Sequence, residues 1–115
     1  MTRNLLILGA GQYGRVVYDI ALATSGFSRI DFLDDNSADA IGRMSDYAKF
    51  ADRYTDAVAA IGNPDLRLSL LDKLSEHYLL PTLIHPQATV MPSAEIGQGC
   101  VIEPQAVIHS NTVIG

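Results

Sequence analysis

A repeat of six residues in the last third of the chain constrains the fold more than any other feature. An aliphatic residue recurs at every sixth position, and a small residue follows four positions after each of the first five. The aliphatic positions are Ile84, Val90, Ile96, Ile102, Ile108 and Ile114, and the small ones are Ala88, Ala94, Cys100, Ala106 and Thr112. This period matches neither an amphipathic helix nor an alternating strand. It is typical of a hexapeptide-repeat β-helix, in which the aliphatic residue points into a triangular prism.

The repeat is short for a solenoid. Three hexads make one coil, so residues 84–115 amount to fewer than two coils. Solenoid units bury their apolar faces only against neighbouring units, and about three or more are needed for stability. We therefore expect this sequence to stop partway into its second domain.

The first two thirds of the chain alternate between strand-like and helix-like segments. Continuous apolar runs predict strands that are buried on both faces of a parallel sheet. Asn63 and Pro64 predict the N-cap and the first turn of a helix. The expected elements are strands at 5–8, 30–33 and 57–61, a short helix near 45–50, and helices after Gly14 and after Asn63. The sequence thus predicts a small Rossmann-like α/β domain at 1–82 and the first coils of a left-handed β-helix at 83–115.

Composition excludes several classes of function. The formal net charge of -5 argues against nucleic acid as the main partner, because phosphate binding is driven by Lys and Arg. No stretch approaches the roughly 18 apolar residues of a membrane span, so we expect no membrane partner. The single cysteine, Cys100, allows neither an intrachain disulfide nor a cysteine-based metal site. A cytoplasmic protein without a metal is expected.

A glycine-rich loop follows the first predicted strand and opens the first predicted helix. Gly9 permits a tight turn, Gly11 lets a phosphate approach the backbone, and Gly14 allows the helix to pack closely on the strand. The free N–H groups of the helix start would face that phosphate. Asp34 lies twenty residues after Gly14, where a dinucleotide fold places its ribose-binding carboxylate. Nucleotide binding is the favoured interpretation, and a close strand-to-helix turn without a ligand is the alternative.

The glycine pattern alone does not distinguish NAD from other nucleotides. Two features argue against NAD. The α/β region is about half the size of a full dinucleotide fold. Asp34 is also followed by Asp35, and two adjacent acceptors suit the donors of a base or a sugar. An exposed acidic pair in a turn is the other interpretation of these two residues.

Four motifs in order resemble one protein family. They are Leu-Gly-Ala-Gly-x-x-Gly-Arg-Val-Val, Phe-Leu-Asp-Asp, Ala-Ile-Gly-Asn-Pro-x-x-Arg and Pro-Thr-Leu-Ile-His-Pro-x-Ala-x-Val-x-Pro-Ser-Ala-x-Ile-Gly-x-Gly. Together they resemble the bacterial nucleotide-sugar acetyltransferases of the bacillosamine and sialic-acid type, from residue 4 to residue 115. The resemblance implies an N-terminal nucleotide-sugar-binding domain and a trimerising left-handed β-helix that binds acetyl-CoA, in which a histidine acts as the base.

The resemblance also implies a substrate site in this chain. The glycine loop would hold the sugar-phosphate side, the acidic pair the uracil or ribose side, and the start of the last helix would complete the pocket. The residues implied are Gly9, Gly11, Gln12, Tyr13, Gly14, Asp34, Asp35, Gly62 and Asp65. Many family members have a histidine where this chain has Tyr13, so the sugar-side contact differs here.

The resemblance places the catalytic histidine and the acetyl-CoA contacts on coils beyond residue 115. We therefore expect no catalytic residue within this sequence. His77 is expected at the surface, His85 at the domain junction, and His109 facing outward from the prism. Cys100 is expected to pack at a corner of a hexad.

Three functions follow from these patterns. The first is the substrate-binding part of an acetyl-CoA-dependent N- or O-acetyltransferase that acts on a UDP-sugar or a related nucleotide sugar. On that interpretation the chain alone transfers no acetyl group. The second is a non-catalytic nucleotide-sugar-binding or assembly module. The third is an NAD-dependent oxidoreductase fragment, and it is disfavoured because a dehydrogenase contains no hexapeptide repeats.

Overall fold

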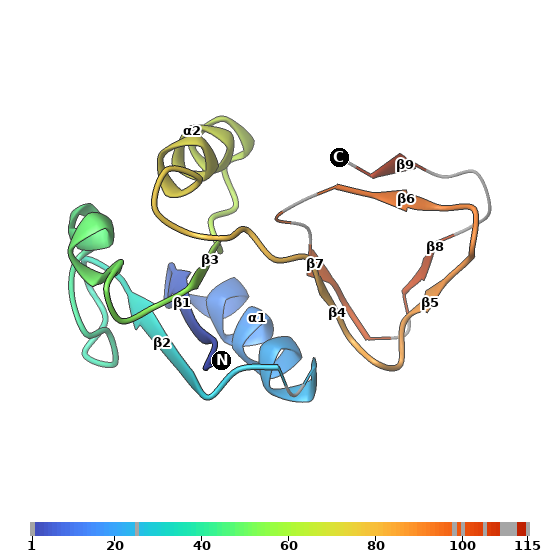
Figure 1. Ribbon diagram of the computed structural model, residues 1–115, viewed down its shortest axis with the longest axis horizontal. Coiled ribbons are helices and arrows are strands. Elements are labelled where there is room, and N and C mark those ends of the chain that lie inside the picture. The colour runs from blue at the N-terminus through green and yellow to red at the C-terminus, as the bar shows by residue number, and fades with distance from the viewer. Residues whose placement is uncertain are drawn as a thin grey trace.

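A computed structural model of the chain shows a small parallel sheet with helices on both faces, followed by a β-helix (Figure 1). The structure describes residues 2–24, 26–97, 99, 101–104, 106–108, 113 and 114, and only the backbone at 95, 96, 108, 113 and 114. In chain order the elements are β1 (Asn4–Leu8), α1 (Gln12–Thr24), β2 (Arg29–Leu33), the 3-10 helix η1 (Met44–Phe50), β3 (Asp56–Ala59), α2 (Pro64–Leu74), β4 (Leu83–Ile84), β5 (Thr89–Val90), β6 (Glu95–Ile96), β7 (Val101–Ile102), β8 (Val107–Ile108) and β9 (Val113–Ile114).

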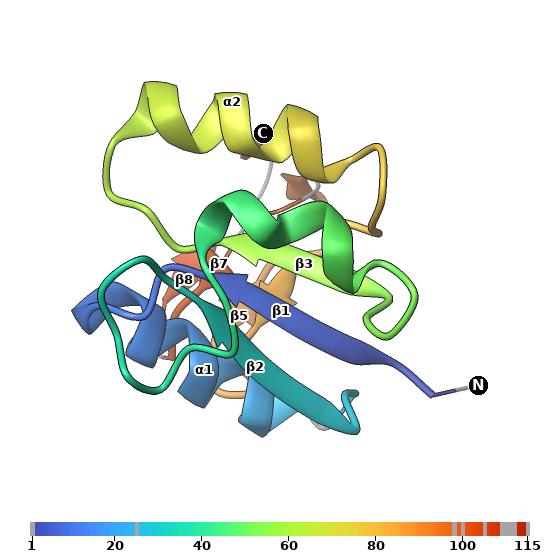
Figure 2. The same cartoon turned by 90° about the vertical axis from the view of Figure 1, so that its left-hand side faces the viewer.

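The sheet has the strand order β2-β1-β3, and both strand pairs are parallel. β1 lies in the centre, which explains why its sequence is apolar at every position from Leu5 to Leu8. Leu5 and Ile7 belong to the core on the α1 side, whereas Leu6 and Leu8 belong to the core on the side of η1 and α2. Figure 2 shows these three layers, with α1 on one face and η1 and α2 on the other.

Two polar side chains at the starts of elements have specific partners. The side-chain oxygen of Asn63 accepts hydrogen bonds from the backbone N–H groups of Asp65 and Leu66, at 3.0 and 3.1 Å, so it caps α2 as predicted. Asp56 at the start of β3 is fully buried and pairs with the guanidinium of Arg3, whose Nη2 lies 2.5 Å from Oδ2. Because an unpaired charge at this depth is costly, the pair fixes the N-terminus against β3.

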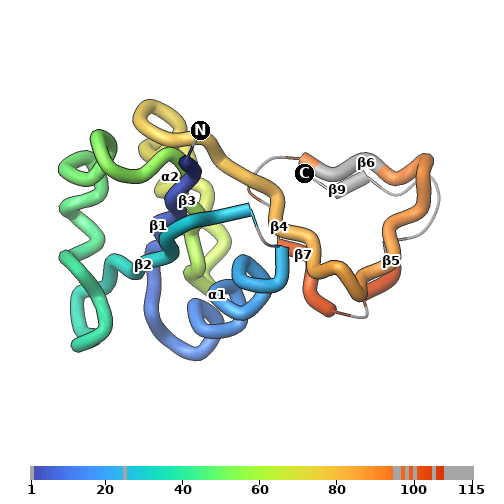
Figure 3. Tube along the Cα trace, turned by 60° about the horizontal axis from the view of Figure 1, so that its bottom comes forward, coloured from blue at the N-terminus to red at the C-terminus, as the bar shows by residue number. Residues whose placement is uncertain are grey.

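The hexads form the predicted β-helix. β4 pairs with β7, β5 with β8 and β6 with β9, all in parallel, so each strand lies on the strand three hexads away. Figure 1 shows these pairs as the three sides of a triangle, and Figure 3 shows β4 and β7 together from another direction. Ile102 on the second coil is only 5% exposed, whereas Ile84 on the first coil is 37% exposed.

The two parts of the chain share one core. Leu83, the first residue of β4, is buried within the cluster that α1 covers, and Val101 of β7 packs against the same cluster. The Thr82 hydroxyl donates to the carbonyl of Gly97, and Arg67 Nη2 donates to the carbonyl of Gly99 at 2.9 Å. The sequence boundary predicted between 82 and 83 is therefore crossed by packing and by hydrogen bonds.

Burial of the repeat aliphatics predicts unequal costs of truncation. Ile102→Ala removes a buried side chain from the prism and should lower the free energy of unfolding by about 2–5 kcal/mol. Val107→Ala on the next strand, where the side chain is 50% exposed, should change it by less than about 0.5 kcal/mol. Urea unfolding monitored by circular dichroism compares the two variants, and equal losses would contradict the inward orientation of Ile102.

Candidate functional site

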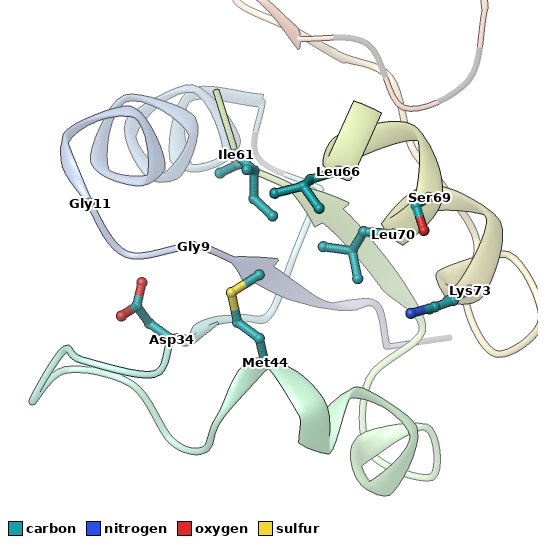
Figure 4. Close-up of a pocket in the computed structure, with 10 residues that line it drawn as sticks. Gly9, Gly11, Asp34, Met44, Ile61, Leu66, Ser69, Leu70 and Lys73 are labelled. Carbon is teal, nitrogen blue, oxygen red and sulfur yellow. The ribbon is translucent and has the colours of Figure 1, made fainter. Parts of the chain in front are cut away.

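A cavity of about 500 Å³ opens at the carboxyl ends of the strands (Figure 4). Its size lies within the roughly 300–1,000 Å³ range of small-molecule sites. The lining residues come from the glycine loop, the ends of β2 and β3, the start of η1 and one face of α2. They are Gly9, Gly11, Asp34, Met44, Ala60, Ile61, Leu66, Ser69, Leu70 and Lys73.

The position of this cavity follows from the topology of the sheet. β1 is followed through α1 by β2 on one side, and the chain then crosses to β3 on the other side. The connections leaving β1 and β3 therefore diverge at the carboxyl edge and leave a crevice between them. Ligands of open α/β sheets bind at such a switch point.

The three glycines of the loop have different structural roles. Gly9 has φ of 115°, and a Cβ there would lie 2.5 Å from the carbonyl oxygen of Ala60. A Cβ at Gly14 would collide with the carbonyl oxygen of Gly9. No described atom lies within 4 Å of a Cβ built at Gly11, which lines the cavity. Two glycines are thus required by packing, and the third leaves room for a ligand.

Asp34 ties the end of β2 to the glycine loop. Its Oδ2 accepts a hydrogen bond from the Ala10 N–H at 2.7 Å, and its Oδ1 accepts one from the Asn36 N–H at 2.8 Å. The Ala10 and Asn36 N–H groups hold the pKa of the Asp34 carboxyl below its ordinary value, because they favour the ionised form. Asp34 is partly buried and lines the cavity.

The segment after Asp34 is also fixed by carboxylates. Asp35 Oδ1 accepts from the Met44 N–H at 3.1 Å and so holds the start of η1. Asp39 forms an ion pair with Arg15 of α1, and the Arg15 guanidinium lies 5.1 Å from the centre of the Phe32 ring. The wall of the cavity that carries Met44 is therefore attached to both the second strand and the first helix.

α2 presents one face to the cavity rather than to the sheet. Leu66, Ser69, Leu70 and Lys73 follow the i, i+3, i+4, i+7 spacing of one helix face. Four leucines of this helix, Leu66, Leu70, Leu71 and Leu74, have the spacing of an apolar stripe, but only Leu74 is fully buried, and Leu66 is 60% exposed. The stripe splits because α2 meets the sheet mainly at its C-terminal end, where Leu74 joins the core.

The cavity brings together part of the predicted site. Gly9, Gly11 and Asp34 line it, whereas Gly14 is buried in packing and Asp35 is bonded to Met44. The other predicted residues are not among the lining residues, although they adjoin them in the chain: Gln12 and Tyr13 follow Gly11, Gly62 follows Ile61, and Asp65 precedes Leu66. Their contacts with a ligand stay predictions.

Sequence reasoning missed the cavity residues on η1 and on the middle of α2. The helical spacing of Ser69 and Lys73 relative to Leu66 could have indicated that they share a face with it. Met44 had no such signal, because only the folded loop brings η1 to this edge.

The described histidines lie outside the cavity. His77 is exposed, and its ring lies 5.9 Å from the Tyr47 ring, centre to centre. His85 is partly exposed near the junction, and its Nδ1 accepts from the Gln87 N–H at 3.0 Å. His109 and Cys100 lie outside the described residues.

Two further findings concern the described part of the chain only. It contains no group of three or more His, Cys, Asp or Glu side chains placed to hold a metal ion. None of its helices has the length and apolar character required to cross a bilayer.

Comparison with known proteins identifies the family. The model of the PglD N-terminal domain family matches residues 4–74, more than half of the 115 residues. The chain belongs to the PglD N-terminal domain family. The match runs from β1 through α2, the elements that line the cavity.

Individual relatives extend the likeness into the β-helix. The chain is 30% identical over 112 residues to UDP-N-acetylbacillosamine N-acetyltransferase of Bacillus subtilis (strain 168), covering 87% of this chain and 51% of that protein. It superposes with a TM-score of 0.89 and 36% identity on the acetyltransferase domain of PglB from Neisseria gonorrhoeae FA1090, solved with acetyl coenzyme A. That match covers 99% of this chain and 59% of the other.

A second similar structure is PerB from Caulobacter crescentus in complex with CoA and GDP-perosamine, with a TM-score of 0.84 and 26% identity over 97% of this chain and 56% of that one. The chain thus spans about half the length of the relatives it matches. These comparisons confirm the resemblance and the fold class predicted from the sequence, a Rossmann-like sheet followed by the start of a parallel β-helix.

The roles of the glycines can be separated by one pair of variants. Gly14→Ala should lower the free energy of unfolding by about 1–3 kcal/mol, because the new methyl group would collide with the Gly9 carbonyl oxygen. This backbone group cannot move aside as the end of a flexible side chain can. Gly11→Ala should leave stability within about 0.5 kcal/mol of the wild type. Thermal and urea unfolding measure both, and a stable Gly14→Ala variant would disprove the tight packing of α1 on β1.

The Asp34 bonds predict a pH-dependent contribution to stability. Because the folded-state pKa of Asp34 is lowered, its contribution is fully present above the ordinary aspartate pKa of about 3.9 and is lost as the pH falls through the lower folded value. Asp34→Asn should therefore be less stable than wild type at neutral pH, and the gap should narrow below about pH 4. Urea unfolding across this range measures the gap. Asp72→Asn, which removes the same charge at an exposed position of α2, is the control, and a gap independent of pH would contradict the assignment.

Proposed function

We propose that this chain is the nucleotide-sugar-binding part of an acetyl-CoA-dependent sugar acetyltransferase. The observation that carries the proposal is the cavity at the switch point of the sheet, bordered by Gly11 and the start of α1 and closed on another side by Asp34. The unpaired N–H groups at the start of a helix attract a phosphate. A carboxylate at the end of the second strand accepts hydrogen bonds from ribose hydroxyls.

The relatives support the same function. The Bacillus subtilis relative is named for acetyl transfer to a UDP-linked sugar, and the PerB structure contains CoA and GDP-perosamine. In both names a nucleoside diphosphate carries the sugar. We infer that this chain binds the nucleoside diphosphate half of such a substrate. The sugar that accepts the acetyl group would then extend from the phosphates, on the side away from the base. We expect an N-acetylated product, as the name of the Bacillus subtilis relative states for that protein. An O-acetyltransferase would require the same nucleotide site.

Acetyl transfer requires a base near the acceptor amine or hydroxyl. His77 and His85 do not line the cavity, and the Asp34 carboxylate there is a weak base, because the Ala10 and Asn36 N–H groups lower its pKa. We therefore propose that the described residues bind substrate and do not supply the base. The purified 115-residue chain should show no acetyl-CoA-dependent turnover of a UDP-amino-sugar. The homotrimer and the cytoplasmic location stay predictions.

Calorimetric titration of the chain with UDP, GDP and NAD tests the proposed ligand class. Binding of UDP or GDP without binding of NAD is expected, because we expect the cavity to hold one nucleotide and not the two nucleotides of NAD. Binding of NAD alone would replace the proposal with a dinucleotide site. Failure of all three to bind would contradict nucleotide binding by this chain.

A non-catalytic nucleotide-sugar-binding or assembly module is the second candidate. The placement of the two described histidines away from the cavity favours it as much as it favours the first. The two candidates are separated by mixing the chain with a full-length relative and acetyl-CoA and by measuring nucleotide binding and the oligomeric state of the relative. A module acting only in assembly would change the oligomeric state of the relative without binding nucleotide.

A further inference from the structure

The cavity has two chemically different ends. Gly11 and Asp34 lie at one end, and Lys73 lies at the other, at the last turn of α2 (Figure 4). Between them the lining is mostly apolar and comes from three elements: Met44 from η1, Ile61 after β3, and Leu66 and Leu70 from α2. A ligand that fills this space therefore needs a polar end, an apolar middle and a second polar end.

Lys73 differs from the other lysine of the chain. Lys49 forms an ion pair with Asp46 at 3.0 Å, on η1 and outside the cavity. Lys73 is exposed and has no carboxylate partner among the described residues, and Figure 4 shows its amine turned from α2 toward the cavity. A lysine in the last turn also interacts favourably with the helix dipole, but this does not require it to line a cavity.

The glycine end determines how a nucleotide would lie. The free N–H groups of the α1 start suit the phosphates, and the Asp34 carboxylate suits the ribose hydroxyls. The base then extends over the apolar middle, where the thioether of Met44 and the side chains of Leu66 and Leu70 can cover its two faces. Its outer edge reaches the end of the cavity that Ser69 and Lys73 line.

We propose that Lys73 selects nucleotides whose base carries a carbonyl oxygen at its outer edge, such as uracil or guanine, over those that carry an amino group there, such as cytosine or adenine. This inference rests on the proposed function. An ammonium group has three donors and no acceptor, so it can bond a carbonyl oxygen but leaves an amino group without a partner. Ser69 cannot discriminate in this way, because a hydroxyl both donates and accepts.

The size of the effect follows from the type of bond. A hydrogen bond that involves a charged group contributes enough to change affinity by about tenfold or more, and a mismatch adds the cost of an unpaired donor. Lys73 is exposed, which limits the preference to the lower end of this range. We expect UDP and GDP to bind about tenfold more tightly than CDP and ADP.

The test is calorimetric titration of the chain with these four nucleoside diphosphates. Lys73→Met removes the ammonium and keeps the apolar stem, and it should lower UDP and GDP affinity about tenfold while leaving CDP and ADP affinity nearly unchanged. Lys73→Arg retains donors without acceptors and should keep the preference. Lys49→Met removes the same charge outside the cavity and should behave as the wild type.

The outcomes separate this inference from the proposed function. If Lys73→Met weakens all four nucleotides equally, Lys73 is a phosphate contact and the inference is wrong, while the nucleotide site stands. If the wild type binds all four with equal affinity, the inference is wrong in the same way. If the wild type binds none of them, the proposed function fails and the inference fails with it. Circular dichroism of each variant confirms that a lost preference is not a lost fold.

Discussion

The approach of backbone to backbone around the glycine loop is the constraint on which the site depends. Gly9 adopts a positive φ and contacts the carbonyl of Ala60, while Gly14 contacts the carbonyl of Gly9. These contacts draw the start of α1 and the end of β3 onto the end of the central strand. Any side chain at either glycine would separate the elements that border the cavity. Gly11 lies between these two close contacts in the loop, and the space beside it is open.

α2 connects that cavity to the β-helix. One face of the helix lines the cavity with Leu66, Ser69, Leu70 and Lys73. The neighbouring face reaches the second domain, where Arg67 donates to the carbonyl of Gly99, and the Leu71 side chain lies against the same glycine. The cavity wall on α2 and the turn of a hexad are therefore separated by the width of a single helix. On the other side of the sheet, Leu83 and Val101 join the α1 core, so the β-helix is attached to both helices.

The sequence predicted the fold well wherever a pattern was local. The hexads predicted both the β-helix and the pairing of strands three hexads apart, because each repeat unit carries its own signal. The glycine spacing predicted the turn from β1 into α1 and the carboxylate at the end of β2. The α2 leucines were harder to interpret, since an apolar stripe predicts burial without saying whether a core or a ligand covers it. Met44 had no local signal, because its position depends on a hydrogen bond between residues nine apart, in which the Met44 N–H donates to the Asp35 carboxylate.

The acidic pair shows why a motif position and a contact are different statements. In this chain Asp34 and Asp35 each accept a backbone N–H, from Ala10 and from Met44, so both hold cavity walls in place. A carboxylate has about four acceptor positions, so these bonds leave capacity for ligand hydroxyls. Asp34 can serve both roles because it lines the cavity, and its backbone bonds keep it ionised and oriented before a ligand arrives. Asp35 does not line the cavity, so its influence on a ligand acts through the position of Met44. A substitution at Asp35 should therefore disturb the apolar middle of the cavity, whereas one at Asp34 should disturb the polar end next to the glycine loop.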